Sequence, residues 1–258
     1  MRWALYRRAA PDSRNRARLV NSDGLLVFAR CAGFVFRAPG FSHPSVPPSV
    51  RAGLALVLAV GLAPAVQTHH SFEGLAFVFA LASELAVGAA IGVGASVLYD
   101  GAYAGGRALD DYVGIRASVP NAAVAASSGF GRIWSLTFLA AFFVLDGYQI
   151  VIRVFADGFS HLPPGALVGP LAWQQFAISL PVLVLKAAAL VAGPAIALIF
   201  VIQFGLGALS RVIPRFQSFT LSFPIVFGAA LLVTILMVPL LFPLAGRPWL
   251  QLPFLAVR

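Results

Sequence analysis

The chain has 258 residues, of which 60% are hydrophobic and 10% are charged, whereas soluble domains average about 45–50% apolar and about 25% charged residues. These values exclude an ordinary soluble domain and predict an integral membrane protein. The formal net charge is +9, and six arginines stand among the first 18 residues. A basic flank beside a first hydrophobic segment marks the cytoplasmic side or contacts anionic lipid, which explains the charge better than nucleic-acid binding does.

Hydrophobic segments follow one another along most of the chain, and we predict an all-α, polytopic membrane fold of kinked or broken helical hairpins. A basic polar extension (1–23) precedes a membrane region (24–246) and a short tail (247–258). A single span needs about 20 residues, so the first segment is short, and the fifth is too long for one straight crossing. The predicted segments number about six, at about 25–39, 50–66, 75–99, 133–152, 176–209 and 219–244.

Two connections between these segments are polar or rich in turn-forming residues. Residues 100–132 form the most polar interior stretch of the chain, with acidic and basic side chains. Residues 157–175 form a loop rich in proline and glycine. Prolines also fall inside the last two apolar segments, where each removes a backbone donor and typically kinks a helix.

Charged residues inside apolar segments do not suit helices that stand alone in lipid. A charge at the bilayer centre costs about 2.5–3.5 kcal/mol on insertion scales. Gly88 and Gly92 are four residues apart, a spacing that lets two helices approach closely. Each feature alone has an ordinary explanation, such as arginines that extend from helix ends toward the interface. Together they predict that other protein covers much of this surface. The charged residues are Arg30, Arg37, Glu84, Asp146 and Lys186.

No catalytic or metal-binding pattern stands out in the sequence. Asp110-Asp111 lacks a second acidic cluster of the kind that binds Mg²⁺ in prenyl-transfer enzymes, so an acidic pair at a helix end explains it better. Ser127-Ser128 loosely resembles the serine loop of intramembrane proteases, but a nucleophile needs an adjacent base. His69-His70 has no evident third ligand, and Cys31 is the only cysteine. We therefore expect no enzymatic activity, cofactor or metal, and an inert Cys31.

Several short motifs, taken in order, resemble the FliR/SctT family of type III secretion export gates. The likeness covers about residues 25–245 and rests on the order and spacing of motifs that are individually unspecific. Its first half is carried by Arg30, Pro39, Pro47, Arg51, Pro64, Glu84, Gly88, Gly105, Asp110, Asp111 and Gly114. Its second half is carried by Pro163, Gly165, Arg211, Pro214, Phe219 and Pro224, although Arg215 stands where the family usually has glutamine.

The resemblance implies a core subunit of an export gate in the bacterial inner membrane. Its partners would be FliP/SctR-like and FliQ/SctS-like membrane subunits and an FlhB/SctU-like switch protein. Unfolded export substrates would pass transiently through the shared pore, and membrane lipid would surround it. Energy for export would come from other components. The acidic pair Asp110-Asp111 and the run 128–131 look closer to the injectisome branch than to the flagellar branch.

In the family, the loop after the stretch that contains Gly114 contributes to the plug that closes the pore. Here that loop corresponds to about residues 113–128, and the alternative is an ordinary loop between helices. A small secondary transporter and a membrane-embedded enzyme are the other functions left open by the sequence. Alanines and serines give much of this loop little bulk, and the residues that we assign to the plug are Val113, Ser118, Pro120, Asn121, Ser127 and Ser128.

Overall fold

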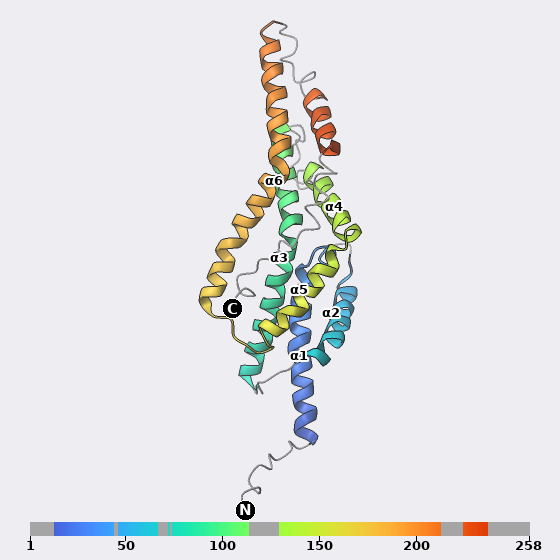
Figure 1. Cartoon of the computed structure of the whole chain (residues 1–258), viewed down its shortest axis with the longest axis vertical. Coiled ribbons are helices and arrows are strands. Elements are labelled where there is room, and N and C mark those ends of the chain that lie inside the picture. Colours follow the sequence, from blue (N-terminus) through green and yellow to red (C-terminus); the bar gives the residue numbers. More distant parts are fainter. Residues whose placement is uncertain are drawn as a thin grey trace, which may run out of the picture. The chain divides into compact units, whose positions relative to one another are not determined.

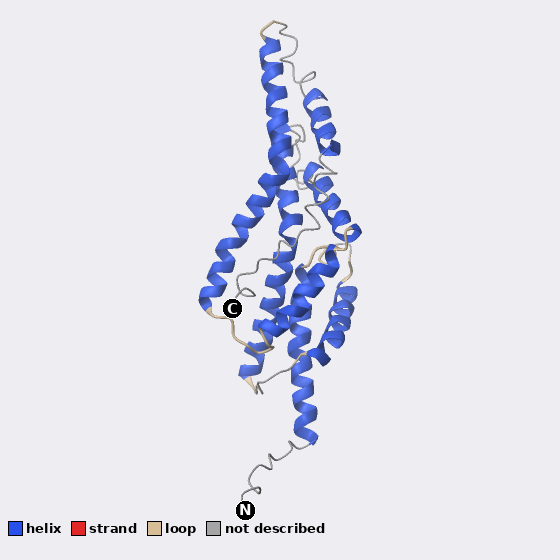
Figure 2. Ribbon diagram, viewed as in Figure 1, coloured by secondary structure: helices blue, strands red, loops and turns tan. Residues whose placement is uncertain are grey.

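The computed structural model describes residues 13–43, 46–66, 72, 74–113, 129–212 and 224–236. Every regular element within these residues is a helix, which confirms the predicted all-α class (Figures 1 and 2). The elements in chain order are α1 (Ser13–Arg37), α2 (Pro48–Leu62), the short 3-10 helix η1 (Ala63–Ala65), α3 (Leu75–Val113), α4 (Gly129–Val144), α5 (Gly147–His161), α6 (Pro170–Ser210) and a helical stretch at Pro224–Leu236.

Two helices, α3 and α6, are long and apolar enough to cross a membrane. The pair α4 and α5, bent by 74° at their junction, would be a third span if it is counted as one. Asp146 lies in that junction with a φ of 55°, a left-handed conformation that aspartate tolerates better than most residues. The apolar helices α2 and Pro224–Leu236 are shorter than a span. About six hydrophobic segments thus become two or three candidate crossings.

Three boundaries differ from the sequence predictions. Helix α1 begins at Ser13, within the predicted extension. Helix α3 continues to Val113, well into the predicted polar stretch, and Ser96 supports it there by donating a 2.7 Å hydrogen bond to Asp100 one turn later. Helix α6 begins at Pro170, a residue type favoured in the first turn because its missing N–H has no partner to lose. The predicted 157–175 loop therefore shrinks to residues 162–169.

Helix α6 remains one element of 41 residues although Pro181 and Pro194 lie inside it. The helix changes direction along its length (Figure 1), which is the ordinary consequence of interior proline. The fifth segment is therefore one bent helix, and its being too long for one straight crossing stays a prediction.

The chain divides into two compact units. The first comprises Met1–Gly92 with Ala156–Val168, and the second comprises Val93–Phe155 with Gly169–Arg258. In the second unit, Trp134 of α4 is fully buried and its indole N–H donates to Thr234 at 3.2 Å. Gly105 of α3 packs there against α6, because a Cβ on it would lie 2.9 Å from the backbone oxygen of Ala188.

In the first unit, glycines bring α1 and α3 into backbone contact. A Cβ on Gly88 would lie 1.9 Å from the backbone oxygen of Arg30, and one on Gly33 would lie 2.1 Å from that of Leu85. A Cβ on Gly92 would lie 2.7 Å from the oxygen of Phe34. This is the close approach that the Gly88–Gly92 spacing predicts, and it positions the cluster described next.

Candidate functional site

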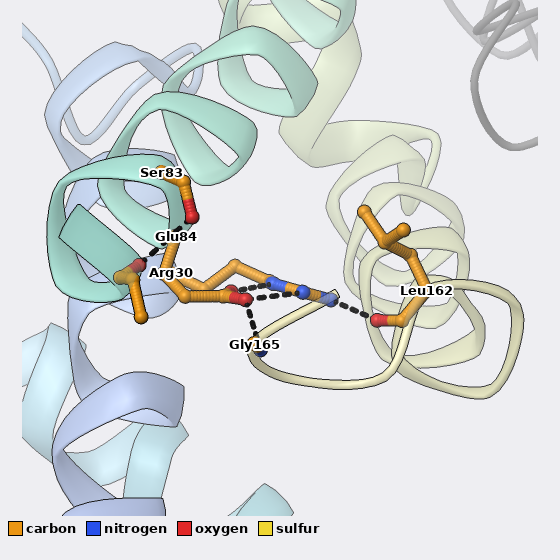
Figure 3. Close-up of polar contacts among 6 residues, drawn as sticks. Arg30, Ser83, Glu84, Leu162 and Gly165 are labelled. Atoms are coloured by element: carbon orange, nitrogen blue, oxygen red, sulfur yellow. Dashed lines mark hydrogen bonds and ion pairs between the residues drawn. The ribbon is translucent and has the colours of Figure 1, made fainter. Parts of the chain in front are cut away.

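A buried ion pair joins α1 to α3 within the first unit (Figure 3). Nε of Arg30 donates to Oε2 of Glu84 at 2.5 Å, and Nη2 donates to Oε1 at 3.0 Å. This is the two-point geometry in which a guanidinium holds a carboxylate most strongly. Each side chain is 1% exposed. Gly88 stands one turn after Glu84 and allows the backbone of α3 to approach Arg30 this closely.

The loop that follows α5 completes the cluster. Nη1 of Arg30 donates to the carbonyl oxygen of Leu162 at 2.7 Å, and the backbone N–H of Gly165 donates to Oε1 of Glu84 at 2.7 Å (Figure 3). The guanidinium also lies 4.5 Å from the ring centroid of Phe159 in α5, within the range of a cation–π contact. Two charges from α1 and α3 therefore hold a third segment of the chain.

The sequence of that loop explains its shape. A 3.0 Å hydrogen bond from the N–H of Ala166 to the oxygen of Pro163 closes a turn over residues 163–166. Pro164 and Gly165 occupy its central positions, and Gly165 has a φ of +85°. Proline followed by glycine with positive φ is the signature of a type II turn. A Cβ on Gly165 would also lie 2.4 Å from the ring of Phe72, so both conformation and space require glycine.

The arrangement is chemically saturated. Both carboxylate oxygens of Glu84 and all three guanidinium nitrogens of Arg30 are engaged. A buried network of this kind fixes the segments that contribute to it, and every nitrogen and oxygen of its two charged groups has a partner within the chain. Over the part of the chain that the structure describes, no group of three or more His, Cys, Asp or Glu side chains is placed to hold a metal ion.

A second set of predicted residues lies in the other unit, where α3 ends and α4 begins. Asp110 is 1% exposed, and its Oδ1 accepts a 2.9 Å hydrogen bond from the backbone N–H of Phe130. The carboxylate thereby satisfies one of the first N–H groups of α4, which have no partner inside their own helix. A Cβ on Gly106 would lie 2.4 Å from Cα of Gly131. Asp111 is exposed, so the two neighbouring acids have different environments.

The remaining predicted residues are scattered. In the first unit, Pro39 is buried after α1, Pro47 precedes α2, Pro64 lies in η1, and Nη2 of Arg51 donates to the oxygen of His43 at 2.9 Å. In the second unit, Gly105 and Val113 belong to α3, Arg211 is exposed after α6, and Pro224 begins the last described helix. The residues that lie outside the described part of the chain are Gly114, Ser118, Pro120, Asn121, Ser127, Ser128, Pro214 and Phe219.

The structure therefore unites motifs that are far apart in the sequence. Arg30, Glu84, Gly88, Pro163 and Gly165 come from three motif blocks and meet at one place. The interpretation of Arg30 as an arginine that extends from a helix end to the interface is wrong, because its side chain is fully enclosed.

Phe159 was missed in the sequence, where it is one of many phenylalanines. Leu162 belongs to the same short motif as Pro163 and Gly165, but it contributes only a backbone oxygen, which a side-chain pattern does not predict. The one feature of the sequence that indicated such a cluster was the presence of two opposite charges, Arg30 and Glu84, in apolar segments, where each needs a partner.

Comparisons with known proteins give a consistent result. The family model described as bacterial export proteins, family 1, matches residues 22–252. The flagellar biosynthetic protein FliR of Pectobacterium carotovorum subsp. carotovorum is 24% identical over 227 residues, which cover 84% of this chain and 85% of that protein. The flagellar biosynthetic protein FliR of Escherichia coli (strain K12) is 24% identical over 222 residues, which cover 83% of each.

Proposed function

The chain belongs to family 1 of the bacterial export proteins, and we propose that it is a core subunit of a type III protein export gate. In this role it forms part of an inner-membrane pore through which unfolded proteins leave the cytoplasm. Its partners are membrane subunits of the FliP/SctR and FliQ/SctS types and a switch protein of the FlhB/SctU type. The chain contributes structure to the conduit and catalyses no reaction.

The length and exposure of α6 carry this proposal. At about 1.5 Å per residue, its 41 residues extend about 60 Å, roughly twice the hydrocarbon core of a bilayer. Large apolar side chains are nevertheless exposed along the whole helix, from Leu171 (72%) and Ile178 (72%) to Phe204 (74%). A bilayer covers only part of such a helix. Other protein must cover the rest, as a subunit of a multi-chain pore requires.

Co-expression tests the proposal directly. The chain, co-expressed with the FliP/SctR-like and FliQ/SctS-like subunits of its own genome, should purify as one stable complex. Expressed alone, it should aggregate or be degraded, because α6 then exposes its apolar side chains. A well-behaved monomer in detergent that binds a small solute would instead support a transporter.

We also propose that residues 113–128 form the plug of the pore. Support comes from the resemblance to the family, from the small and polar residues of this run, and from the Asp110–Phe130 hydrogen bond next to its two ends. Deletion of residues 117–128 should make cells or vesicles with the assembled complex permeable to ions. An assembled but ion-tight deletion complex would contradict this role.

The choice between a flagellar and an injectisome system rests on different observations. The sequence interpretation favours the injectisome branch, through Asp110-Asp111 and the run 128–131. Both relatives carry the flagellar name and lend that preference no support. Rod and hook genes beside this gene would identify a flagellar system, and needle genes would identify an injectisome.

A further inference from the structure

Lys186 is the only lysine of the chain, and it lies on the exposed side of α6 between large apolar side chains. Leu185 is 68% exposed and Leu190 is 48% exposed beside it, and Val182, one turn earlier, is 45% exposed. Among the described residues, the structure gives Lys186 no hydrogen bond or ion pair. The described residues therefore leave a strongly hydrated ammonium on an apolar surface without a counter-charge.

The position of Lys186 along α6 rules out a simple lipid environment. It is the 17th of 41 residues, about 24 Å from the start at about 1.5 Å per residue. If the bilayer is centred near this residue, the charge lies in hydrocarbon at a depth that is costly. If the bilayer covers either half of the helix instead, the exposed apolar residues of the other half stand outside it. In each placement, protein must cover the apolar surface of α6 before Lys186, after it, or around it.

The same side of α6 offers room for a close neighbour. Ala189, Gly193 and Ala197 are exposed and spaced by four residues, and a Cβ on Gly193 would meet nothing within 4 Å. The opposite side uses the same kind of spacing against α3, where a Cβ on Gly101 would lie 2.5 Å from the side chain of Ala187. Spacing of this kind lets helix backbones approach closely in membranes. On the exposed side, no described residue fills the space beside Gly193.

We propose that this face of α6 packs against an apolar helix of another subunit that carries an aspartate or glutamate, and that Lys186 pairs with that carboxylate. The inference rests on the proposed function, since it needs a multi-subunit assembly. Charge complementarity selects the occupant. An apolar surface that covers the ammonium without an anion would leave a buried charge unpaired, which costs far more than a paired one. A second copy of this face would place two ammonium groups together and is disfavoured.

Crosslinking can test the pairing because the chain has one lysine. A membrane-permeant carbodiimide joins an amine to a nearby carboxylate as an amide, with loss of water. In the co-expressed membrane complex it should couple this chain to one partner subunit, and peptide mass spectrometry should find Lys186 joined to Asp or Glu. Lys186→Arg keeps the charge but cannot form this stable amide, so the crosslinked band should disappear while the complex still assembles. A crosslink from Lys186 to a carboxylate within the chain, or an assembled complex in which no Lys186 peptide is joined to a partner's Asp or Glu, would overturn the proposal.

A second variant separates pairing from contact with lipid or water. Lys186→Met leaves the partner's carboxylate unpaired and should reduce the yield of complex by about tenfold or more, since loss of one member of a buried charge pair is costly. A lysine that faces lipid headgroups or the aqueous lumen would give unchanged yield with Met. That result would refute the pairing but not the export-gate function. Absence of any co-purifying subunit with the unmodified chain would instead refute the proposed function.

Discussion

The Arg30–Glu84 cluster predicts a large and strongly coupled loss of stability when either partner is removed. Glu84→Ala leaves a guanidinium that is 1% exposed without its carboxylate, and breaking such a buried pair costs about 3–5 kcal/mol. The N–H of Gly165 loses its acceptor as well, which adds about 1–3 kcal/mol if no water replaces it. Solvent screening is negligible at this burial. The sum, about 4–8 kcal/mol, is comparable with the whole stability of many domains, about 5–15 kcal/mol.

Unfolding by SDS in mixed micelles, followed by the fluorescence of the four tryptophans, would measure this loss in the assembled complex. The set comprises Glu84→Ala, Arg30→Met and the double variant. The double variant removes both charges, so its cost should fall short of the sum of the single costs by about 2–3 kcal/mol. Arg37→Ala is the matched control, because Arg37 is on the same helix but exposed and should shift stability by less than about 0.5 kcal/mol. Additive single costs, or a Glu84→Ala loss no larger than that of the control, would refute the reasoning.

Three further predictions concern other buried groups. Gly88→Ala should separate α1 from α3 and strongly reduce the amount of folded chain in membranes, because its Cβ would lie 1.9 Å from the oxygen of Arg30. Asp110→Ala should destabilise the start of α4 by about 0.5–2 kcal/mol, the usual value of a helix cap, and should speed amide exchange there, whereas Asp111→Ala should not. Cys31, at 0% exposure, should react with a maleimide only after denaturation.

Each of these predictions has an outcome that contradicts it. Gly53 of α2 has open space around its Cβ, so Gly53→Ala should leave the chain as abundant as before or slightly more stable. Equal abundance of the Gly88 and Gly53 variants would show that α1 and α3 are not in backbone contact. Equal exchange rates in the two aspartate variants would remove the capping role of Asp110. Rapid labelling of Cys31 in the native complex would show that α1 opens readily.

Much of the fold followed from composition and hydropathy because these are local properties. Long apolar runs with few charges predict membrane helices wherever they occur, and α3 and α6 bear this out. The helix ends were harder to place. Helix α3 runs through Asp100 and Asp110 because both acids find donors there, although such residues look like a loop in the sequence. Ser96, one turn earlier in the same helix, donates to Asp100, and the backbone N–H of Phe130 in α4 donates to Asp110.

The motif residues likewise could be identified from the sequence, but their contacts could not. The resemblance identified Arg30, Glu84 and Gly165 as members of separate motifs, and the family comparison supports that assignment of the chain. Their meeting could not be read from spacing, since Arg30 and Glu84 are 54 residues apart and Gly165 is 81 residues from Glu84. From the sequence alone, several oppositely charged or polar groups were possible partners for Arg30 and for Glu84.

The sequence by itself determined that this protein is a helical membrane protein of the export family and that its internal charges need partners. Only the tertiary structure decided which partners they have. Burial makes an unpaired charge costly, but the identity of its partner depends on which backbones can approach, and here glycines let α1 and α3 meet while a proline–glycine turn turns the third segment toward them. Arg30 thus finds its anion inside the chain, whereas no described residue supplies one to Lys186 on the exposed side of α6.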